Sequence, residues 1–268
     1  MILNKMVLYT EIKKSLDKFK IKRSSIVYIS GNIFNLGLKK KDLKIFCEFF
    51  FSIIKKKISN SGGIIVPTAT LNIANTKKIY TRNTPSYMMG VFSEYVRKKE
   101  GCNRSNHPLW SFAGIGKNVE KLLKNVPISA YGYDSIFERL LNYNTYFICF
   151  GKPDLSLAML HYVENLVGVP YRYNKEFLIR CKFKGKIIKK KSILGVRYNS
   201  KYNVGDENKK IMNYLNKKKI FKKISFRKDF IYICNYADIV KTMCTILSDR
   251  PTIWLKNEKI NQKKILKF

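Results

Sequence analysis

The stretch YFICFGKPDLSLAMLHYVENLVGVP, residues 146–170, contains the pattern that decides the fold. Tyr146–Phe150 is a short, wholly apolar run, as in a strand that is buried on both faces of a sheet. Turn-forming residues follow at Gly151, Pro153 and Asp154. A helix is then expected from about Leu155 to Val167, because Gly168 and Pro170 are typical of a helix end. A buried strand that turns directly into a helix is typical of α/β proteins.

The rest of the chain alternates in the same way. Buried strands are expected at Ser25–Ser30 (SIVYIS) and Gly63–Pro67 (GIIVP). Helices are expected at Lys39–Lys57, at Tyr87–Lys98 with Ser86 as its N-cap, at Lys117–Leu123 and at Ser135–Leu141. The later elements are a β-hairpin over Glu176–Val196, a helix at Glu207–Asn216, strands at Lys219–Ser225 and Phe230–Cys234, and a helix at Ala237–Ser248. This order predicts a layered α/β fold, with residues 1–255 as a single domain and 256–268 as a basic, loosely ordered tail.

Net charge is the most extreme feature of the composition, with 53 basic against 18 acidic residues, or +35. Such a balance favours anionic partners, either nucleic acid, anionic lipid or small anionic ligands. Lysine, Ile, Asn, Phe and Tyr are all encoded by A/T-rich codons, however, so a biased genome can produce the same surface. The basic runs also lack interleaved aromatic residues, which does not favour a dedicated nucleic-acid interface. The charge therefore limits the partners without naming them.

Compartment and metal content follow from simpler counts. The six cysteines show no C-x-x-C spacing and only two histidines accompany them, so no metal site is expected. The cysteines are expected to be small buried residues in a reducing compartment. The longest apolar run, Ile45–Ile54, is too short to span a membrane and contains Glu48, and no signal peptide is recognised. We therefore expect a cytoplasmic protein without membrane insertion.

His161 and Glu164 are the candidates for acid–base chemistry. They lie three residues apart in the expected helix, so their side chains share one face and can touch. A carboxylate beside an imidazole fixes its tautomer and stabilises the imidazolium that forms when the ring accepts a proton. Such a pair is also common on ordinary helix surfaces. It gains interest here because the helix starts at the carboxyl end of a buried strand, where open α/β sheets bind ligands.

Several common enzyme motifs are missing from the sequence. There is no G-x-S-x-G nucleophile elbow, no G-x-x-x-x-G-K-[ST] phosphate loop and no G-x-G-x-x-G dinucleotide fingerprint. The other histidine, His107, lies in the loop Arg104–Pro108 (RSNHP), which has neither helical nor strand periodicity.

The order of five short motifs adds a resemblance to a known family. They are Asn83–Ser86 (NTPS) with Met88–Gly90, Arg104–Pro108 (RSNHP), Ser111–Gly116 (SFAGIG), Tyr131–Gly132 with Ser135 and Arg139–Leu140, and Leu160–Glu164 (LHYVE). This order resembles the aminoglycoside 3-N-acetyltransferase family, also called the antibiotic N-acetyltransferase family. The family's run is T-P-S-x-M-G, R-S-x-H-P-x-x-S-F-A-x-G, Y-G-x-x-S-x-x-x-R-L and H-x-x-E. The likeness covers roughly residues 20 to 250.

The resemblance implies a three-layer α/β/α sandwich, here with an additional β-hairpin region, that transfers an acyl group from acyl-coenzyme A to a sugar amine. It implies His161 as general base and Glu164 as its partner. The residues implied for the acceptor side are Ser105, His107, Ser111 and Tyr131. Acetyl-CoA, or another short acyl-CoA, is expected along Ser30, Gly31, Asn32, Thr84, Ser86 and Met88. No metal is expected to take part, and the oligomeric state is left open, with a homodimer among the alternatives.

Two departures from the family pattern bear on the acceptor. The family usually has a histidine and serines after the first strand, where this chain has Ile29–Asn32, and it favours N-T-S-L where this chain has Leu157–Leu160. Aminoglycosides are polycations, which a +35 chain repels at long range. We therefore favour a nucleotide-linked amino sugar for surface polysaccharide synthesis, an anionic acceptor that the family also uses. Aminoglycoside acetylation with antibiotic resistance is the alternative, and a catalytically inactive basic binding module is the second alternative.

Overall fold

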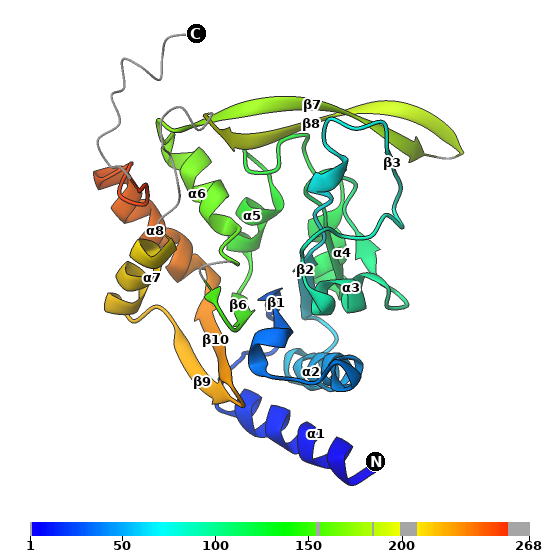
Figure 1. Ribbon diagram of the computed structural model, residues 1–268, viewed down its shortest axis with the longest axis vertical. Helices are drawn as coiled ribbons and strands as arrows, with labels where there is room; N and C mark the ends of the chain where they lie inside the picture. The colour runs from blue at the N-terminus through cyan, green and yellow to red at the C-terminus, as the bar shows by residue number, and fades with distance from the viewer. Residues whose placement is uncertain (1, 154–155, 184, 199–207, 257–268) are drawn as a thin grey trace.

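Figure 1 shows the computed structural model, which describes residues 2–153, 156–183, 185–198 and 208–256. Its centre is a mixed sheet with the strand order β4-β5-β2-β1-β6-β10-β9. The middle three strands, β2, β1 and β6, are parallel, whereas β5 and β10 flank them in the antiparallel direction. The strands are β1 (Ile26–Gly31), β2 (Gly63–Pro67), β4 (Asn103–Arg104), β5 (Phe112–Ile115), β6 (Thr145–Phe150), β9 (Lys222–Phe226) and β10 (Asp229–Asn235).

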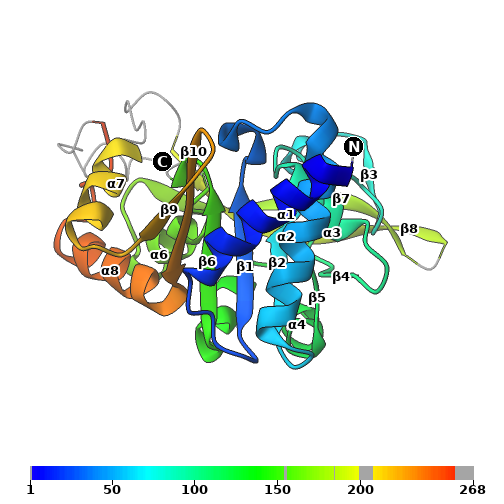
Figure 2. The ribbon, with the colours of Figure 1, turned by 90° about the horizontal axis from the view of Figure 1, so that it is seen from below.

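The sheet is covered on both faces, because its central strands carry apolar side chains toward both of them. In β1, Val27 and Ile29 enter one core, whereas Ile26 and Tyr28 enter the other. The first face is covered by α1 (Ile2–Asp17), α2 (Leu43–Ile58) and α3 (Val91–Arg97). The second is covered by α4 (Lys117–Leu123), α5 (Ile136–Arg139), α6 (Met159–Val167), α7 (Asn208–Lys217) and α8 (Tyr236–Asp249). Figure 2 shows α1 and α2 lying across the same face, and the predicted three-layer sandwich is confirmed.

A second, smaller sheet has the order β3-β7-β8 and contains the predicted hairpin. Its strands are β3 (Ile79–Tyr80), β7 (Arg172–Phe183) and β8 (Lys186–Arg197). In Figure 1 the hairpin crosses the top of the molecule, at the end opposite α1. β8 is hydrogen-bonded to the loop between α4 and α5, because the N–H of Ile193 donates to the carbonyl of Ile128 (2.7 Å) and its carbonyl accepts from the N–H of Ala130 (3.0 Å).

The largest difference from the predicted elements lies before α3. A helix was expected from Tyr87 with Ser86 as its cap, but the helix begins only at Val91 and its N-cap is Gly90. Gly90 has φ 88° and Met88 has φ 57°, and neither angle fits an α-helix. The residues from Ser86 to Gly90 instead form an irregular loop, whose Gly90 lies against the carboxyl end of β1. The prediction that Ser86 caps the helix is therefore wrong.

Other differences are smaller. α1 was not predicted, and short 3₁₀ turns occur at Ile33–Leu36, Lys40–Asp42, Leu71–Ile73 and Leu140–Asn142. α6 begins at Met159 rather than near Leu155, and the expected loose tail lies outside the described residues from 257 onward. Within the described part of the chain, no helix combines the length and apolar character that crossing a membrane requires.

Candidate active site

α6 presents His161 and Glu164 beside the carboxyl end of β6. The other residues of its first turns, including Met159 and Val163, are buried in the core and fix the helix against the sheet. Gly168, at φ 74°, ends the helix, and its N–H donates to the carbonyl of Glu164 (3.1 Å). His161 keeps 27% of its side chain exposed, whereas Glu164 keeps 1%. The imidazole therefore meets solvent, and the carboxylate lies behind it.

The Glu164 carboxylate has partners on both oxygens. Its Oε2 accepts a hydrogen bond from His161 Nδ1 (2.9 Å) and lies 2.6 Å from Arg172 Nε as an ion pair. Its Oε1 accepts from the hydroxyl of Tyr171 (2.8 Å). Burial opposes ionisation of Glu164, but these three partners outweigh it and the pKa of the carboxyl is lowered. Glu164 is therefore a fixed negative charge at neutral pH.

The protonation state of His161 follows from its surroundings. Burial lowers the pKa of His161, and the positive charges of Arg172 and Arg197 lower it further, whereas Glu164 raises it; the balance is a lowered pKa. The ring is therefore neutral at pH 7. Because Nδ1 donates to a carboxylate, the lone pair lies on Nε2. This is the state that a general base requires.

Two aromatic residues frame the imidazole. The ring of Tyr131 lies 5.4 Å from the ring of His161 between centroids, and that of Trp110 lies 6.5 Å away, both in edge-on geometry. Trp110 follows the RSNHP loop in sequence and Tyr131 precedes α5, so the fold brings two of the predicted motifs to α6. The indole N–H of Trp110 is buried without a hydrogen-bond partner among the described residues.

His107 is a buried residue, with 3% of its surface exposed, that holds the loop carrying Trp110. Its Nδ1 accepts from the N–H groups of Trp110 (2.8 Å) and Leu109 (3.3 Å), and its Nε2 donates to the carbonyl of Ile128 (3.0 Å). Burial lowers the pKa of His107 to about 4. The ring is therefore neutral at working pH and both of its nitrogens are engaged. Its contact with substrate stays a prediction.

Replacing His107 with alanine is expected to lower the free energy of unfolding by roughly 2–4 kcal/mol, because the buried N–H groups of Leu109 and Trp110 lose their acceptor. Chemical denaturation at neutral pH measures this loss, with Tyr133→Ala, at an 89% exposed position, as the control. A His107→Ala protein as stable as that control would show that the hydrogen bonds of His107 do not contribute to the free energy of unfolding.

The two predicted serines are also buried. The Ser111 hydroxyl donates to the carbonyl of Thr68 (2.8 Å) and accepts from Arg104 Nε (3.0 Å), and the Ser105 hydroxyl accepts from the N–H of Phe112 (3.0 Å). Both join loops at the carboxyl end of the sheet. Their contact with the acceptor stays a prediction.

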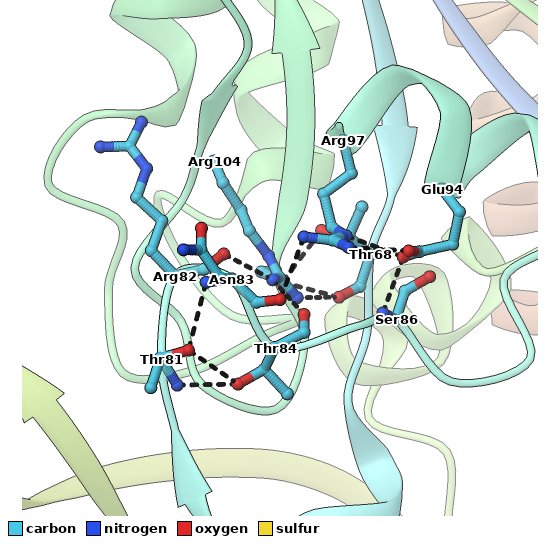
Figure 3. A network of polar contacts seen from close by, with 10 residues as sticks. Thr68, Thr81, Arg82, Asn83, Thr84, Ser86, Glu94, Arg97 and Arg104 are labelled. Carbon is cyan, nitrogen blue, oxygen red and sulfur yellow. Dashed lines mark hydrogen bonds and ion pairs between the residues drawn. The ribbon is translucent and has the colours of Figure 1, made fainter. Parts of the chain in front are cut away.

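Arginine side chains organise the loop that contains Thr84 and Ser86, as Figure 3 shows. The Arg104 guanidinium donates to the carbonyls of Thr68 (2.8 Å), Arg82 (2.9 Å) and Thr84 (2.5 Å). On the other side, Glu94 pairs with Arg97 (2.8 Å) and accepts from the N–H of Ser86 (2.8 Å). This pairing lowers the pKa of Glu94 to about 2 despite its partial burial. The loop backbone is therefore held while its outer side chains remain exposed.

The two segments predicted to hold coenzyme A lie against each other. Gly31, at the end of β1, has φ 103°, and a Cβ on Gly90 would lie 2.8 Å from its carbonyl oxygen. Met88 is 82% exposed, and the Ser86 hydroxyl is buried without a partner in the described structure. That coenzyme A lies along these two segments stays a prediction. Asn32 and Thr84 use their side chains within their own loops, on Phe34 and Thr81.

Sequence reasoning missed the partners of Glu164. Tyr171 and Arg172 lie just after the turn that ends α6, where their positions gave no periodicity to notice. One signal was available. In a chain whose basic residues are mostly lysines, an arginine marks a place where a planar, multidentate cation is needed.

Comparisons with known proteins show the family and the fold. The sequence model of the family described as aminoglycoside 3-N-acetyltransferase matches residues 49–248. No curated protein matches the sequence. Among solved structures, YokD from Bacillus subtilis has 16% identity and a TM-score of 0.73, over 90% of this chain and 99% of that one.

Two further solved structures are similar in fold. AAC-IIIb in its binary complex with CoASH has 14% identity and a TM-score of 0.77, over 93% of this chain and 98% of that one. Sisomicin-bound AAC-VIa has 17% identity and a TM-score of 0.74, over 90% of this chain and 98% of that one. The resemblance inferred from the motif order is confirmed, and the chain belongs to the aminoglycoside 3-N-acetyltransferase family of acyltransferases.

Proposed function

We propose that the chain transfers an acetyl group from acetyl-CoA to the amine of an amino sugar, with His161 as general base. The observation that carries this proposal is the His161–Glu164 pair, 2.9 Å apart, with a neutral and partly exposed imidazole. Nε2 of His161 takes a proton from the amine as its nitrogen attacks the thioester carbonyl. Glu164 stabilises the imidazolium. When the C–S bond breaks, the proton passes to the departing thiolate, and an amide and free coenzyme A result.

The donor site in this proposal is the edge formed by Gly31 and the Thr84–Met88 loop. Support for this location comes from the close approach of the two segments. The CoASH complex of the similar protein AAC-IIIb supports coenzyme A as the donor. Backbone N–H groups and a hydroxyl of these loops would stabilise the oxyanion of the tetrahedral intermediate. No covalent acyl-enzyme is needed.

An aminoglycoside is the acceptor that we propose first. The family description and the sisomicin complex of AAC-VIa support it better than they support the nucleotide-linked acceptor that the sequence favoured. A second candidate, an amino sugar that carries an anionic group, is favoured by one observation. Arg172 and Arg197 both act on His161, with Glu164 as the counter-charge, so the local field does not attract a polycation.

Thiol release from acetyl-CoA separates these acceptors. The wild-type chain is given an aminoglycoside or a nucleotide-linked amino sugar at equal concentration, each at low and at physiological salt. We expect release with the aminoglycoside, with a KM that falls as salt screens the +35 chain. Release with the nucleotide-linked sugar alone would replace the first acceptor by the second. No release with either acceptor would contradict the proposed function.

A further inference from the structure

We propose that Arg172, the first residue of β7, is a positioning residue for the His161–Glu164 pair. It forms an ion pair with the Glu164 carboxylate, keeps that carboxylate oriented toward the imidazole and balances its negative charge. The inference rests on the proposed role of His161 as the base. It assigns a function to a residue outside the H-x-x-E motif.

The geometry places Arg172 and His161 on the same carboxylate oxygen. Arg172 Nε lies 2.6 Å from Glu164 Oε2, the atom that also accepts from His161 Nδ1. Arg172 is itself anchored, because its Nη1 donates to the carbonyl of Gly195 in β8 (3.0 Å). Only 10% of its side chain is exposed. The contact with Glu164 is an ion pair without hydrogen-bond geometry, because Arg172 Nε and Nη2 have no hydrogen-bond partner among the described residues. Together with the hydrogen bonds from His161 and Tyr171, this charge contact leaves the carboxylate little freedom to rotate, so the imidazole has little freedom as well.

Charge gives Arg172 a second effect. The groups that face His161 are Glu164 from its own helix, Arg172 from β7 and Arg197 from β8, together with Tyr171 and Tyr131 from the adjoining loops. The negative charge of Glu164 and the positive charge of Arg172 cancel, so a proton added to His161 leaves a net positive charge in a partly buried site. Arg172 therefore opposes protonation of His161 and keeps Nε2 available.

The competing explanation is that Arg172 only clamps the hairpin to α6. A clamp would affect stability and activity together, but it would not change the protonation midpoint of His161. The readout must therefore be the titration of that single ring, which does not depend on turnover.

The chain is well suited to such a titration because it contains only two histidines. His107 is buried with a pKa of about 4, so the imidazole signal that moves between about pH 5 and about pH 9 belongs to His161. A His161→Asn variant assigns the signal. Imidazole NMR spectra are then recorded for wild type, Arg172→Met and Arg172→Lys.

We expect Arg172→Met to raise the His161 midpoint by about one pH unit, because a positive charge near the ring is lost while Glu164 remains. Arg172→Lys keeps the charge and is expected to stay near the wild-type midpoint, with a lower kcat because a point charge cannot hold both Glu164 and Gly195. Arg180→Met is the matched control, because Arg180 lies on the same strand and contacts the carbonyl of Lys77 instead (3.2 Å). The titration midpoint of His161 should not move in the Arg180→Met protein.

Arg172→Met can fail to fold, so the same change is also made in a Glu164→Gln background, where no carboxylate is left unpaired. A raised midpoint in either background supports the proposal, and an unchanged midpoint in both folded proteins overturns it. The acid limb of kcat/KM should move with the midpoint. If the midpoint moves and the acid limb does not, Arg172 tunes His161 as proposed, but His161 is not the base and the proposed function fails.

Discussion

Replacement of His161 by alanine is expected to lower kcat/KM for acetyl transfer by about 10²- to 10⁴-fold, the usual contribution of a positioned general base. Nothing else described near Nε2 can take its place. Glu164 is behind the ring with both oxygens engaged, and His107 is buried in its own hydrogen bonds. The loss should fall on kcat more than on the KM for acetyl-CoA, because the donor loops do not contact His161 through any described hydrogen bond.

Steady-state thiol release with a fixed acceptor measures this loss. Leu166→Ala is the matched control, because Leu166 lies on the same helix, is 57% exposed and should leave activity unchanged. Raising the pH should recover part of the activity of the His161→Ala protein, since a larger share of the acceptor amine is then free of its proton. Turnover within about threefold of wild type at neutral pH would show that His161 is not the base.

Replacement of Glu164 by leucine is expected to be the most destabilising change in the site, by about 3–5 kcal/mol. The cause is the Arg172 guanidinium, which stays buried after its counter-charge is removed. Glu164→Gln should cost less stability, because an amide can still pair with Tyr171, yet it should also lower turnover because the charge that stabilises the imidazolium is gone.

Denaturant unfolding of these two variants and of the double variant Glu164→Leu/Arg172→Met measures how much the Glu164–Arg172 ion pair contributes to the free energy of unfolding. The double variant should be more stable than Glu164→Leu alone, because no unpaired charge remains. The folded-state pKa of Glu164 is lowered, so its contribution is present above the unfolded value of about 4.3 and is lost as the pH falls through the folded one. A Glu164→Leu protein with wild-type stability at pH 7 would mean that the ion pair with Arg172 contributes nothing to the free energy of unfolding.

Much of the fold could be predicted because its strongest signals are local. β1, β2 and β6 are runs of apolar residues, and Gly168 with Pro170 ended α6 where expected. α1 was missed although Leu8, Ile12 and Leu16 are buried at four-residue spacing. The neighbours Met6 and Val7 are equally apolar and point to solvent, so the helical period was masked.

The candidate site divides in a similar way. The His161–Glu164 contact follows from three-residue spacing within one helix, so it could be predicted. The structural role of His107 could not, because its partner Ile128 is brought in by the distant strand β8. Arg172 reaches Glu164 only because Gly168 reverses the chain after α6, and a sequence pattern does not show where such a turn directs the next strand.

In the proposed reaction, the chain forms an amide on an amino sugar by direct transfer from acetyl-CoA. The most direct test is to follow the acetyl carbonyl itself, with acetyl-CoA that is isotopically labelled at that carbon, by NMR in the presence of enzyme and acceptor. We expect the thioester signal to be replaced by a sugar acetamide signal, with one free thiol released per amide and no label on the protein. A thioester that persists in the presence of every acceptor, or a carbonyl label that stays on the protein, would contradict it.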